Sequence, residues 1–347
     1  MSVEDCLRDP NRIVIDVRSP SEFAQGHIPG AINVPLFTDH ERALVGTTYK
    51  QCGQEQAISL GLEIAKAKLG TLAADLERAV GQVRKKGGSP SGAIIHCWRG
   101  GMRSRAMKWL GGQLGVDFDL LEGGYKAFRR VGLNYLSCPA RLVVLAGPTG
   151  AGKTRILSDL ARAGQQVIDL EGLAHHRGSV FGGYADRTQP TTEQFQNELI
   201  LKWRGMNRDQ VIWFEGESQV IGRVVIPEEL WQQLTLAPMI FIDVEVQRRI
   251  EFLLQDYGSR DVGAMIDAAS RIKKRLGGLR YREAIDSAEK GDWTNFCRVM
   301  LGYYDKYYFR ALEKRGPTHL HRMEIRNPGV LDNESDIIAL ADRITSS

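Results

Sequence analysis

One segment of this chain, residues 141–164, restricts its fold more than any other. It contains GPTGAGKT at 147–154, which fits the pattern G-x-x-x-x-G-K-[ST] between an apolar strand-like run and a helix-like run. In such a turn, backbone N–H groups face a phosphate, the lysine supplies charge, and the last hydroxyl contacts Mg²⁺ or a phosphate oxygen. The segment predicts a phosphate-binding loop, the P-loop, on an α/β sheet. Its residues are Gly147, Pro148, Thr149, Gly150, Ala151, Gly152, Lys153 and Thr154.

Acidic residues follow two later strand-like runs in the same half of the chain. Asp169 and Glu171 come at the end of 166–171, and Glu215 comes near the end of 211–217. In P-loop proteins that act on nucleotides, an acid after an apolar strand holds the metal. Acids at strand ends also cap the helices that follow them. The three residues are therefore candidates for contact with a substrate or a metal, and the sequence leaves the use of Mg²⁺ open.

A second candidate anion-binding loop follows the apolar run GAIIHC at 92–97. WRGGMR at 98–103 carries two glycines and two arginines and leads into a helix-like segment. Backbone N–H groups, a helix N-terminus and arginine charge favour the thiolate form of Cys97, which attacks electrophilic sulfur, selenium or phosphorus. A buried structural thiol is the alternative, but the glycines and arginines favour a nucleophile. The residues of this cysteine loop are Trp98, Arg99, Gly100, Gly101, Met102 and Arg103.

Composition argues against several other classes of protein. Five cysteines stand at irregular spacings, which fits neither a disulfide framework nor a CxxC zinc site, and no metal site is predicted from them. A hydrophobic fraction of 43% with 25% charged residues is typical of a soluble globular protein, and no apolar run reaches the roughly 20 residues of a membrane span. We therefore expect a cytoplasmic protein that does not contact a membrane. The formal net charge of +4 permits a polyanionic partner without requiring one.

The order of strand-like and helix-like segments predicts two α/β domains. The first half alternates between the two kinds of segment, and 134–141 interrupts this pattern with a proline before the strand of the P-loop. We expect a first domain over 1–135 and a second over 140–347. From about Glu245 the second domain is expected to be mostly helical and is rich in Arg, Lys and Tyr.

Two segments of the first domain belong together, IDVRSPSEFAQGHIPGAINVP at 15–35 and HCWRGGMRS at 96–104. Over about residues 10–130 the chain thereby resembles the rhodanese family. The resemblance implies a rhodanese-like α/β domain in which Cys97 carries a persulfide or an equivalent chalcogen adduct. Cys97 and Arg103 are six residues apart, whereas many rhodaneses have five, and the longer spacing is similar to that of related cysteine phosphatases. The loop is therefore expected to accept a tetrahedral, phosphorus-bearing donor as well as a bare sulfur.

The order of the two domains carries a wider resemblance. Together with the segments 41–51, 121–129 and 169–182, the two loops make nearly the whole chain similar to the bacterial tRNA 2-selenouridine synthase family. This resemblance implies a transferase that replaces the sulfur of 5-substituted 2-thiouridine at the anticodon wobble position by selenium. Selenophosphate would be the donor, supplied by a selenophosphate-producing enzyme, and an S-geranylated intermediate would be made from geranyl diphosphate. The P-loop would hold geranyl diphosphate, although its motif alone favours ATP or GTP.

Basic residues of the helical part are the candidates for holding the anticodon region of tRNA. RIKKRLGGLRYR at 271–282 interleaves positive charges with leucines and a tyrosine, which suits phosphates and unpaired bases. A solvated helix face gives the same pattern, and the family resemblance decides in favour of tRNA. The candidates are Arg271, Lys273, Lys274, Arg275, Arg280 and Arg282.

Two other functions are compatible with these motifs. A rhodanese-type sulfurtransferase or cysteine phosphatase, joined to a nucleotide-dependent kinase, would act on a small molecule with no RNA involved. A nucleotide-switched binding protein would not be an enzyme at all. The intact Cys97 argues against this last function, because a domain that only binds a partner has no need of a thiolate.

Overall fold

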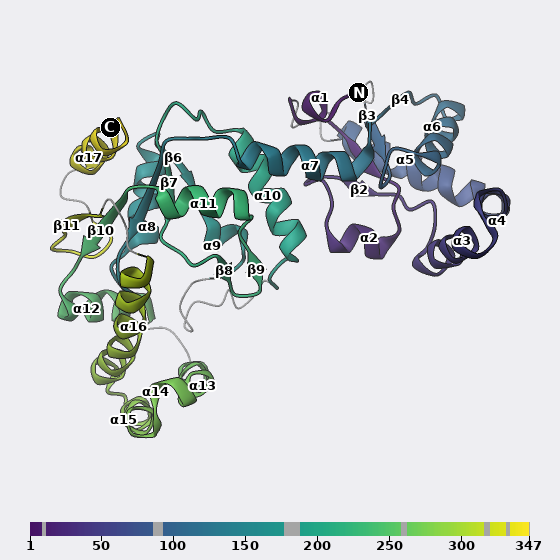
Figure 1. Ribbon diagram of the computed structural model, residues 1–347. Coiled ribbons are helices and arrows are strands. Elements are labelled where there is room, and N and C mark those ends of the chain that lie inside the picture. The colour runs from purple at the N-terminus through teal and green to yellow at the C-terminus, as the bar shows by residue number, and fades with distance from the viewer. Residues whose placement is uncertain are drawn as a thin grey trace. The chain divides into compact units, whose positions relative to one another are not determined.

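Figure 1 shows the computed structural model of the chain, which describes residues 1–8, 12–85, 93–176, 188–257, 262–315, 320–330 and 334–346. The chain divides into two compact units. The first consists of Met1–Tyr135 and Glu193–Leu201, and the second of Leu136–Thr192 and Lys202–Ser347. Parallel strands connected by helices build each unit, which confirms the predicted α/β fold class. None of the described helices is both long and apolar enough to span a membrane.

The sheet of the first unit has four parallel strands in the order β2-β1-β3-β4. They are β1 (Val14–Asp16), β2 (Ile32–Asn33), β3 (Ala93–His96) and β4 (Phe118–Leu120). Asp16 is paired in register with His96, so the carboxyl ends of the two central strands lie side by side. Cys97 follows directly at this edge of the sheet.

Helices cover both faces of this sheet because successive residues of a strand point to opposite sides. Ile15 and Ile95 enter a core that includes Leu72 and Leu76, whereas their neighbours Val14 and Ile94 enter a second core, which includes Phe128. The helices are α1 (Val3–Arg8), α2 (Pro20–Gln25), α3 (Asp39–Cys52), α4 (Gln54–Ala67), α5 (Leu69–Lys85), α6 (Met102–Gln113), α7 (Gly124–Leu136) and, from later in the chain, α10 (Thr192–Arg204), of which Glu193–Leu201 belong to this unit.

The sheet of the second unit has five parallel strands in the order β11-β10-β5-β7-β6. They are β5 (Leu142–Ala146), β6 (Gln166–Ile168), β7 (Ile212–Glu215), β10 (Met239–Asp243) and β11 (Leu320–Glu324). The P-loop strand β5 is central, and the last residue of β7, Glu215, is paired in register with Leu145. This register places the Glu215 carboxylate at the start of the P-loop. A short antiparallel pair, β8 (Val220–Ile221) and β9 (Val224–Val225), follows β7.

Helices of the second unit pack on the sheet and form a separate helical part. Around the sheet lie α8 (Lys153–Arg162), α9 (Leu170–Leu173), α11 (Glu228–Leu236), α12 (Val246–Tyr257) and α17 (Glu334–Thr345). The helical part consists of α13 (Val262–Arg271), α14 (Lys273–Leu276), α15 (Gly278–Glu289) and α16 (Trp293–Arg315), and it shares a core with α12. In Figure 1 this part lies below the sheet of the second unit.

The end of the chain returns to the sheet as β11 and α17, which the expectation of a mostly helical end did not include. The strand β11 lies at the edge of the sheet, and its sequence LHRME is only partly buried. An edge strand needs less apolar character than a central one, so its sequence signal is weak.

Candidate active sites

Cys97 lies directly after β3, where the cysteine loop begins. The backbone N–H of Gly101 donates a hydrogen bond to Sγ at 3.2 Å, and Oγ of Ser104 lies 3.4 Å from Sγ. Cys97 is only 3% exposed. The turn at Gly100 has φ +65°, a conformation that favours glycine and lets the loop fold around the sulfur.

Two buried cysteines of this chain differ in their electrostatic surroundings. Burial raises the pKa of the Cys97 thiol, but hydrogen bonds with Ser104, the charge of Arg103 and the Gly101 N–H lower it by more, and the pKa is below its usual value. At Cys297 burial acts alone and raises the pKa to about 11. Cys297 therefore has the character of a structural thiol, whereas the surroundings of Cys97 favour a thiolate.

The other residues of the cysteine loop differ in where their side chains lie. Trp98 and Met102 are 38% and 52% exposed, and Arg99 is exposed as well. Arg103 donates hydrogen bonds to the carboxylate of Glu22 at 2.7 Å and 3.3 Å, so its charge is shared between Glu22 and the thiol. Arg99 is consequently the arginine of this loop that is open to an anion from solvent.

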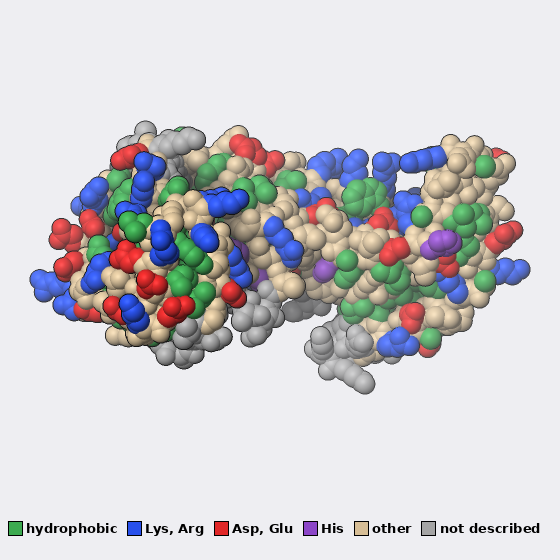
Figure 2. Space-filling view, turned by 90° about the horizontal axis from the view of Figure 1, so that it is seen from below, with side chains coloured by type: hydrophobic (Ala, Val, Ile, Leu, Met, Phe, Trp, Pro, Cys, Tyr) green, Lys and Arg blue, Asp and Glu red, His purple; other side chains and the backbone are tan. Residues whose placement is uncertain are grey.

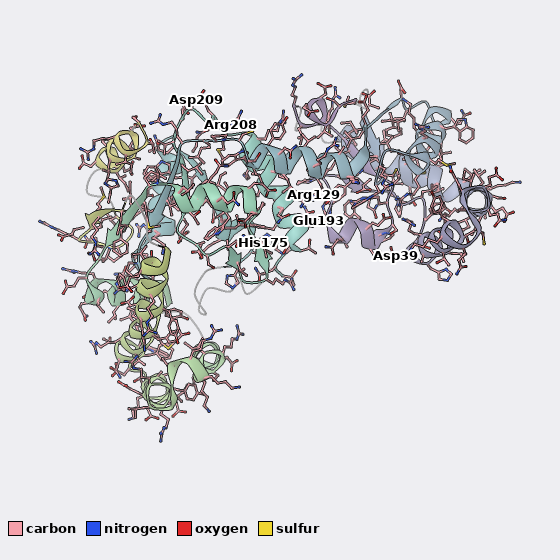
Figure 3. The ribbon with its side chains drawn as sticks, in the orientation of Figure 1. Asp39, Arg129, His175, Glu193, Arg208 and Asp209 are labelled. Carbon is pink, nitrogen blue, oxygen red and sulfur yellow. The ribbon has the colours of Figure 1, made fainter. Side chains whose placement is uncertain are left out.

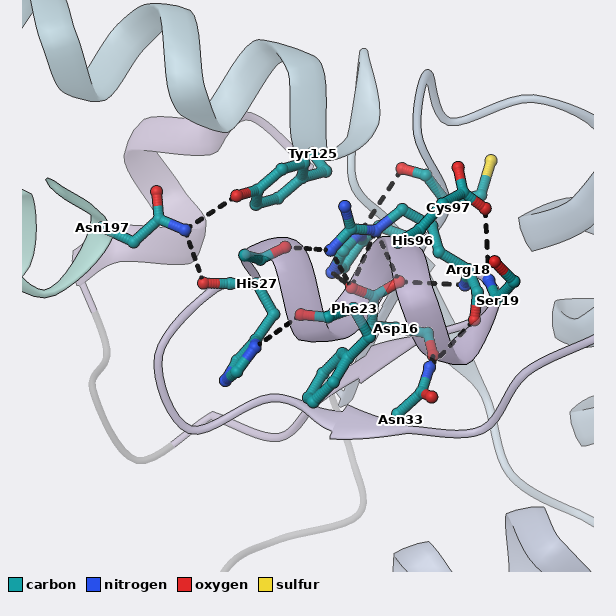
Figure 4. A network of polar contacts seen from close by, with 12 residues as sticks. Asp16, Arg18, Ser19, Phe23, His27, Asn33, His96, Cys97, Tyr125 and Asn197 are labelled. Atoms are coloured by element: carbon teal, nitrogen blue, oxygen red, sulfur yellow. Dashed lines mark hydrogen bonds and ion pairs between the residues drawn. The ribbon is translucent and has the colours of Figure 1, made fainter. Parts of the chain in front are cut away.

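Backbone N–H groups in the first turn of α7 form hydrogen bonds with the cysteine loop. The N–H of Tyr125 donates to the carbonyl of Cys97 at 3.0 Å, and the N–H of Lys126 donates to the carbonyl of Trp98 at 2.9 Å. The buried ring of Tyr125 lies 3.8 Å from the guanidinium carbon of Arg18, which forms an ion pair with Asp16 (Figure 4). These contacts fix the backbone that carries the nucleophile.

His96, the residue before Cys97, belongs to the same buried group. It is fully buried beside Asp16, with Nε2 3.8 Å from the carboxylate. Burial lowers the pKa of His96, although Asp16 acts in the opposite direction. The imidazole is therefore neutral at physiological pH, so it packs against the loop and adds no positive charge beside Cys97.

A polar network extends from Tyr125 to α10. The hydroxyl of Tyr125 donates to Oε1 of Glu193 at 2.7 Å and accepts from Nδ2 of Asn197 at 2.7 Å. Asn197 also donates to the carbonyl of His27 and accepts from Arg129, both at 2.8 Å. Figure 4 shows Asn197 between Tyr125 and His27, and Figure 3 labels Arg129 and Glu193. His27, Tyr125 and Arg129 lie in segments that carry the family resemblance. No motif indicated Glu193 or Asn197, because their partners lie far from them along the chain.

In the second unit the P-loop connects β5 to α8 around the side chain of Lys153. Nζ of Lys153 donates to the carbonyl of Gly147 at 3.1 Å and lies 3.5 Å from the carboxylate of Glu215. Thr154 donates from Oγ1 to the same carboxylate at 3.2 Å. Burial lowers the pKa of Lys153, but Glu215, followed by Tyr308 and other acidic neighbours, raises it above its usual value. The ammonium group therefore stays charged.

The turn of the P-loop depends on glycine at its end. Gly152 has φ +78°, and a Cβ atom there would collide with the backbone of Gly329. A side chain at this position is thus excluded by conformation and by space. The helix α8 begins at the next residue, Lys153, so its unpaired N–H groups and positive dipole end lie at the loop and suit an anion.

Three carboxylates gather beside Lys153. Oxygen atoms of Glu171, Glu215 and Glu217 lie within 4.8 Å of one another, which is a set of ligands that a hard cation such as Mg²⁺ accepts. Burial and the Glu215 carboxylate raise the pKa of Glu217 to about 7. Glu217 was not a predicted candidate, although it stands only two residues after Glu215 in the segment FEGE.

Asp169, the remaining acidic candidate, lies in a different setting. Its carboxylate accepts a hydrogen bond from the N–H of Gly172 at 2.8 Å and caps α9. The side chain is otherwise exposed. This geometry is that of a helix cap, the second of the two roles that the sequence left open.

The six basic candidates lie on α13, α14 and α15. All are exposed, and none forms an ion pair with a residue that the structure describes. Nζ of Lys273 lies 4.8 Å from the ring centre of Tyr281, and Leu279, the residue before Arg280, is 77% exposed. Figure 2 views the molecule from the side of these helices and shows Lys and Arg interspersed with Asp and Glu. The basic patch is thus local rather than a broad positive field.

The fold and the two loops define a protein with a rhodanese-like domain followed by a P-loop domain. The family model of the rhodanese-like domain matches residues 2–130. The model of the tRNA 2-selenouridine synthase AAA domain matches residues 140–327.

Curated relatives match along most of the chain. A tRNA 2-selenouridine synthase from Hahella chejuensis is 35% identical over 87% of this chain and 86% of its own length. Proteins of the same name from Nitrosomonas europaea and Bdellovibrio bacteriovorus are 33% and 34% identical, over 87% and 91% of this chain and 89% and 93% of their own lengths. The chain belongs to the tRNA 2-selenouridine synthase family, which confirms the resemblance noted in its sequence.

Proposed function

We propose that this protein is a tRNA-modifying transferase that replaces the sulfur of a wobble 2-thiouridine by selenium, in two steps at two anion-binding loops. The observation that carries the proposal is the presence of both loops in one chain of this family. One loop surrounds a thiol with a lowered pKa, and the other surrounds a charged lysine at the start of a helix. The first suits selenophosphate and the second suits a diphosphate.

The first step is S-geranylation of the thiouridine, with geranyl diphosphate held by the P-loop. The sulfur on C2 attacks C1 of the geranyl group, so that an S–C1 bond forms and the C1–O bond breaks. The electron pair of that bond leaves with the diphosphate, and the proton on N3 of the uracil is released to solvent. Lys153 and the N-terminus of α8 stabilise the leaving diphosphate by their positive charge.

A divalent cation would fit beside this loop. Glu171, Glu215, Glu217 and the hydroxyl of Thr154 supply the hard oxygen ligands that Mg²⁺ accepts. When bound there, the ion would neutralise charge on the diphosphate.

The second step is the exchange of the geranylthio group for selenium, with Cys97 as the nucleophile that releases selenium from selenophosphate. The thiolate attacks phosphorus, an S–P bond forms, and the P–Se bond breaks with its electron pair on selenium as hydroselenide. Water then cleaves the S–P bond and returns the thiol. The hydroselenide attacks C2 of the modified uracil, its proton passes to N3, and geranylthiolate leaves.

The tRNA itself must be bound through its phosphates. The exposed positive charges of Arg271, Lys273, Lys274, Arg275, Arg280 and Arg282 suit this role. We place the activity in the cytoplasm because tRNA and selenophosphate occur there, and an enzyme that makes selenophosphate is the expected donor partner.

Mass spectrometry of tRNA nucleosides tests the two-step scheme. Thiolated tRNA is incubated with the protein, geranyl diphosphate and selenophosphate, and each component is omitted in turn. We expect S-geranyl-2-thiouridine to accumulate without selenophosphate, and 2-selenouridine to form only when both donors are present. Selenouridine formation without geranyl diphosphate would refute the geranylated intermediate, and a requirement for ATP would favour a kinase-type P-loop.

A Cys97→Ser variant separates the two loops in the same assay. We expect it to bind tRNA and to geranylate thiouridine normally, while selenium insertion is abolished because serine is not deprotonated at neutral pH. Cys297→Ser serves as the matched control, since this cysteine is similarly buried but lies outside both sites. Full selenium insertion by Cys97→Ser would refute the nucleophile.

A further inference from the structure

The helix α16 contacts the P-loop directly through one side chain and indirectly through a second, although it belongs to the helical part and not to the sheet. The N–H of Gly147, the first residue of the loop, donates a hydrogen bond to the hydroxyl oxygen of Tyr308 at 2.8 Å. Three residues earlier on the same helix, Asp305 binds both terminal nitrogens of Arg249 at 2.9 Å and 2.7 Å. Residues three apart share a helix face, so one face of α16 is directed at the loop.

Arg249 connects this face to the middle of the P-loop. It is 3% exposed, and besides Asp305 it donates to the carbonyl of Thr149 at 3.0 Å and to the carbonyl of Val244 at 3.3 Å. A buried guanidinium with all these acceptors is rigidly held. The position of α16 against the loop is therefore fixed at one point by the ion pair between the buried Arg249 and Asp305, and at a second by Tyr308.

The hydroxyl of Tyr308 lies among the groups that define the anion site. It contacts Gly147, whose carbonyl in turn accepts from Nζ of Lys153. The ring packs near Phe241 in the middle of β10, with ring centres 6.3 Å apart. A phenol that accepts a bond from a backbone N–H can at the same time donate its own proton to an anion.

We propose that Tyr308 is a phosphate-binding residue of this site and that its hydroxyl donates a hydrogen bond to the diphosphate held by the P-loop. Arg249 and Asp305 are positioning residues that hold α16, and with it Tyr308, at the loop. This inference rests on the proposed function to the extent that the P-loop ligand is a diphosphate. It adds a side chain from 161 residues further along the chain to a site that the loop motif alone does not complete.

Calorimetric titration of inorganic diphosphate into the full chain tests the proposal without tRNA or a geranyl group. Tyr308→Phe removes one oxygen atom and keeps the ring. We expect diphosphate to bind roughly ten-fold or more weakly to this variant, as for the loss of a hydrogen bond to a charged group. Tyr307→Phe, on the same helix but 43% exposed, is the matched control and should bind as the unaltered protein does.

Asp305→Asn tests the positioning role separately. It retains the Tyr308 hydroxyl but removes the charge that, through Arg249, holds α16 at the loop. We therefore expect weaker diphosphate binding, and adding Tyr308→Phe should weaken it little further. Equal affinity of the unaltered protein and Tyr308→Phe would overturn the role of Tyr308. Failure of the unaltered protein to bind diphosphate would instead overturn the proposed ligand of the P-loop, and thermal unfolding of each variant identifies any loss of fold.

Discussion

Asn197 donates a hydrogen bond to the hydroxyl of Tyr125 at 2.7 Å, and the backbone N–H of Tyr125 donates in turn to the carbonyl of Cys97 at 3.0 Å. A single tyrosine thus connects a buried asparagine of α10 to the loop that carries the nucleophile. Asn197 is fully buried, so each of its hydrogen bonds replaces one that water would otherwise supply.

We expect Asn197→Ala to destabilise the first unit by roughly 1–3 kcal/mol, because it removes the donor to the carbonyl of His27 and one of the two partners of the Tyr125 hydroxyl. Hydrogen–deuterium exchange of the strands β1 and β3, followed by mass spectrometry, measures this destabilisation locally. Lys202→Ala, at an exposed position of the same helix, should change the exchange little. Equal protection in both variants would contradict a supporting role for Asn197.

The lowered pKa of Cys97 predicts the pH dependence of its alkylation. Only the thiolate reacts, and a lowered pKa keeps the thiolate populated to lower pH. As the pH is lowered, the alkylation rate of Cys97 should therefore fall with a midpoint pH below the pKa of a free thiol, which is about 8.5. Ser104→Ala removes the hydroxyl beside Sγ and should shift the midpoint to higher pH. Iodoacetamide labelling of the Cys97 peptide measures the rate, and exposed Cys52 serves as the reference in the same sample. An unchanged midpoint in Ser104→Ala would exclude the hydroxyl as a cause.

At the P-loop, Lys153→Ala should weaken binding of geranyl diphosphate by roughly 10- to 100-fold, since it removes a charged donor from the phosphates. Geranylation of thiolated tRNA should fall in parallel, and product analysis by mass spectrometry measures it. Arg162→Ala, whose side chain is 74% exposed at the other end of α8, is the control for the removal of a positive charge from this helix. Normal geranylation by Lys153→Ala would mean that the P-loop holds another ligand.

The basic patch on α13, α14 and α15 should determine tRNA affinity and its dependence on salt. We expect Arg280→Glu combined with Arg282→Glu to weaken tRNA binding and to reduce the slope of log K against log salt by about 0.7–0.9 for each phosphate that is no longer neutralised. Filter binding at several salt concentrations gives both values. Lys50→Glu combined with Lys66→Glu changes the net charge equally at exposed positions of the first unit. If the two double variants weakened tRNA binding equally, the binding would depend on the net charge of the protein and not on this patch.

Both anion-binding loops could be predicted from the sequence because each is a local structure. The glycines, the lysine and the threonine of the P-loop lie within eight consecutive residues, and the strand and helix on either side are equally local. The side chains that complete the sites could not be predicted in this way. Tyr308 reaches Gly147 across 161 residues and Asn197 reaches Tyr125 across 72, and such contacts depend on how the helices pack.

The pairing of charged residues shows the same limit. The sequence places Arg103 in the cysteine loop, but its partner Glu22, 81 residues earlier in the chain, could not be predicted from the loop motif. The contact between Glu215 and Lys153 depends in the same way on the pairing of strands, because the register of β7 beside β5 brings the Glu215 carboxylate to the lysine. The chemical type of each residue is local information, whereas its partner is set by topology.

The assignment of Glu193–Leu201 to the first unit has a consequence for how the protein is made. These nine residues are encoded after the P-loop and the strand β6, so a nascent chain that has just completed residue 135 still lacks Asn197 and Glu193. The hydroxyl of Tyr125 therefore lacks these two hydrogen-bond partners until residues 193–201 have emerged from the ribosome. The phosphate-binding loop is therefore synthesised before the first unit is complete. A single cut in the gene after residue 135 would remove Glu193–Leu201 from the first unit.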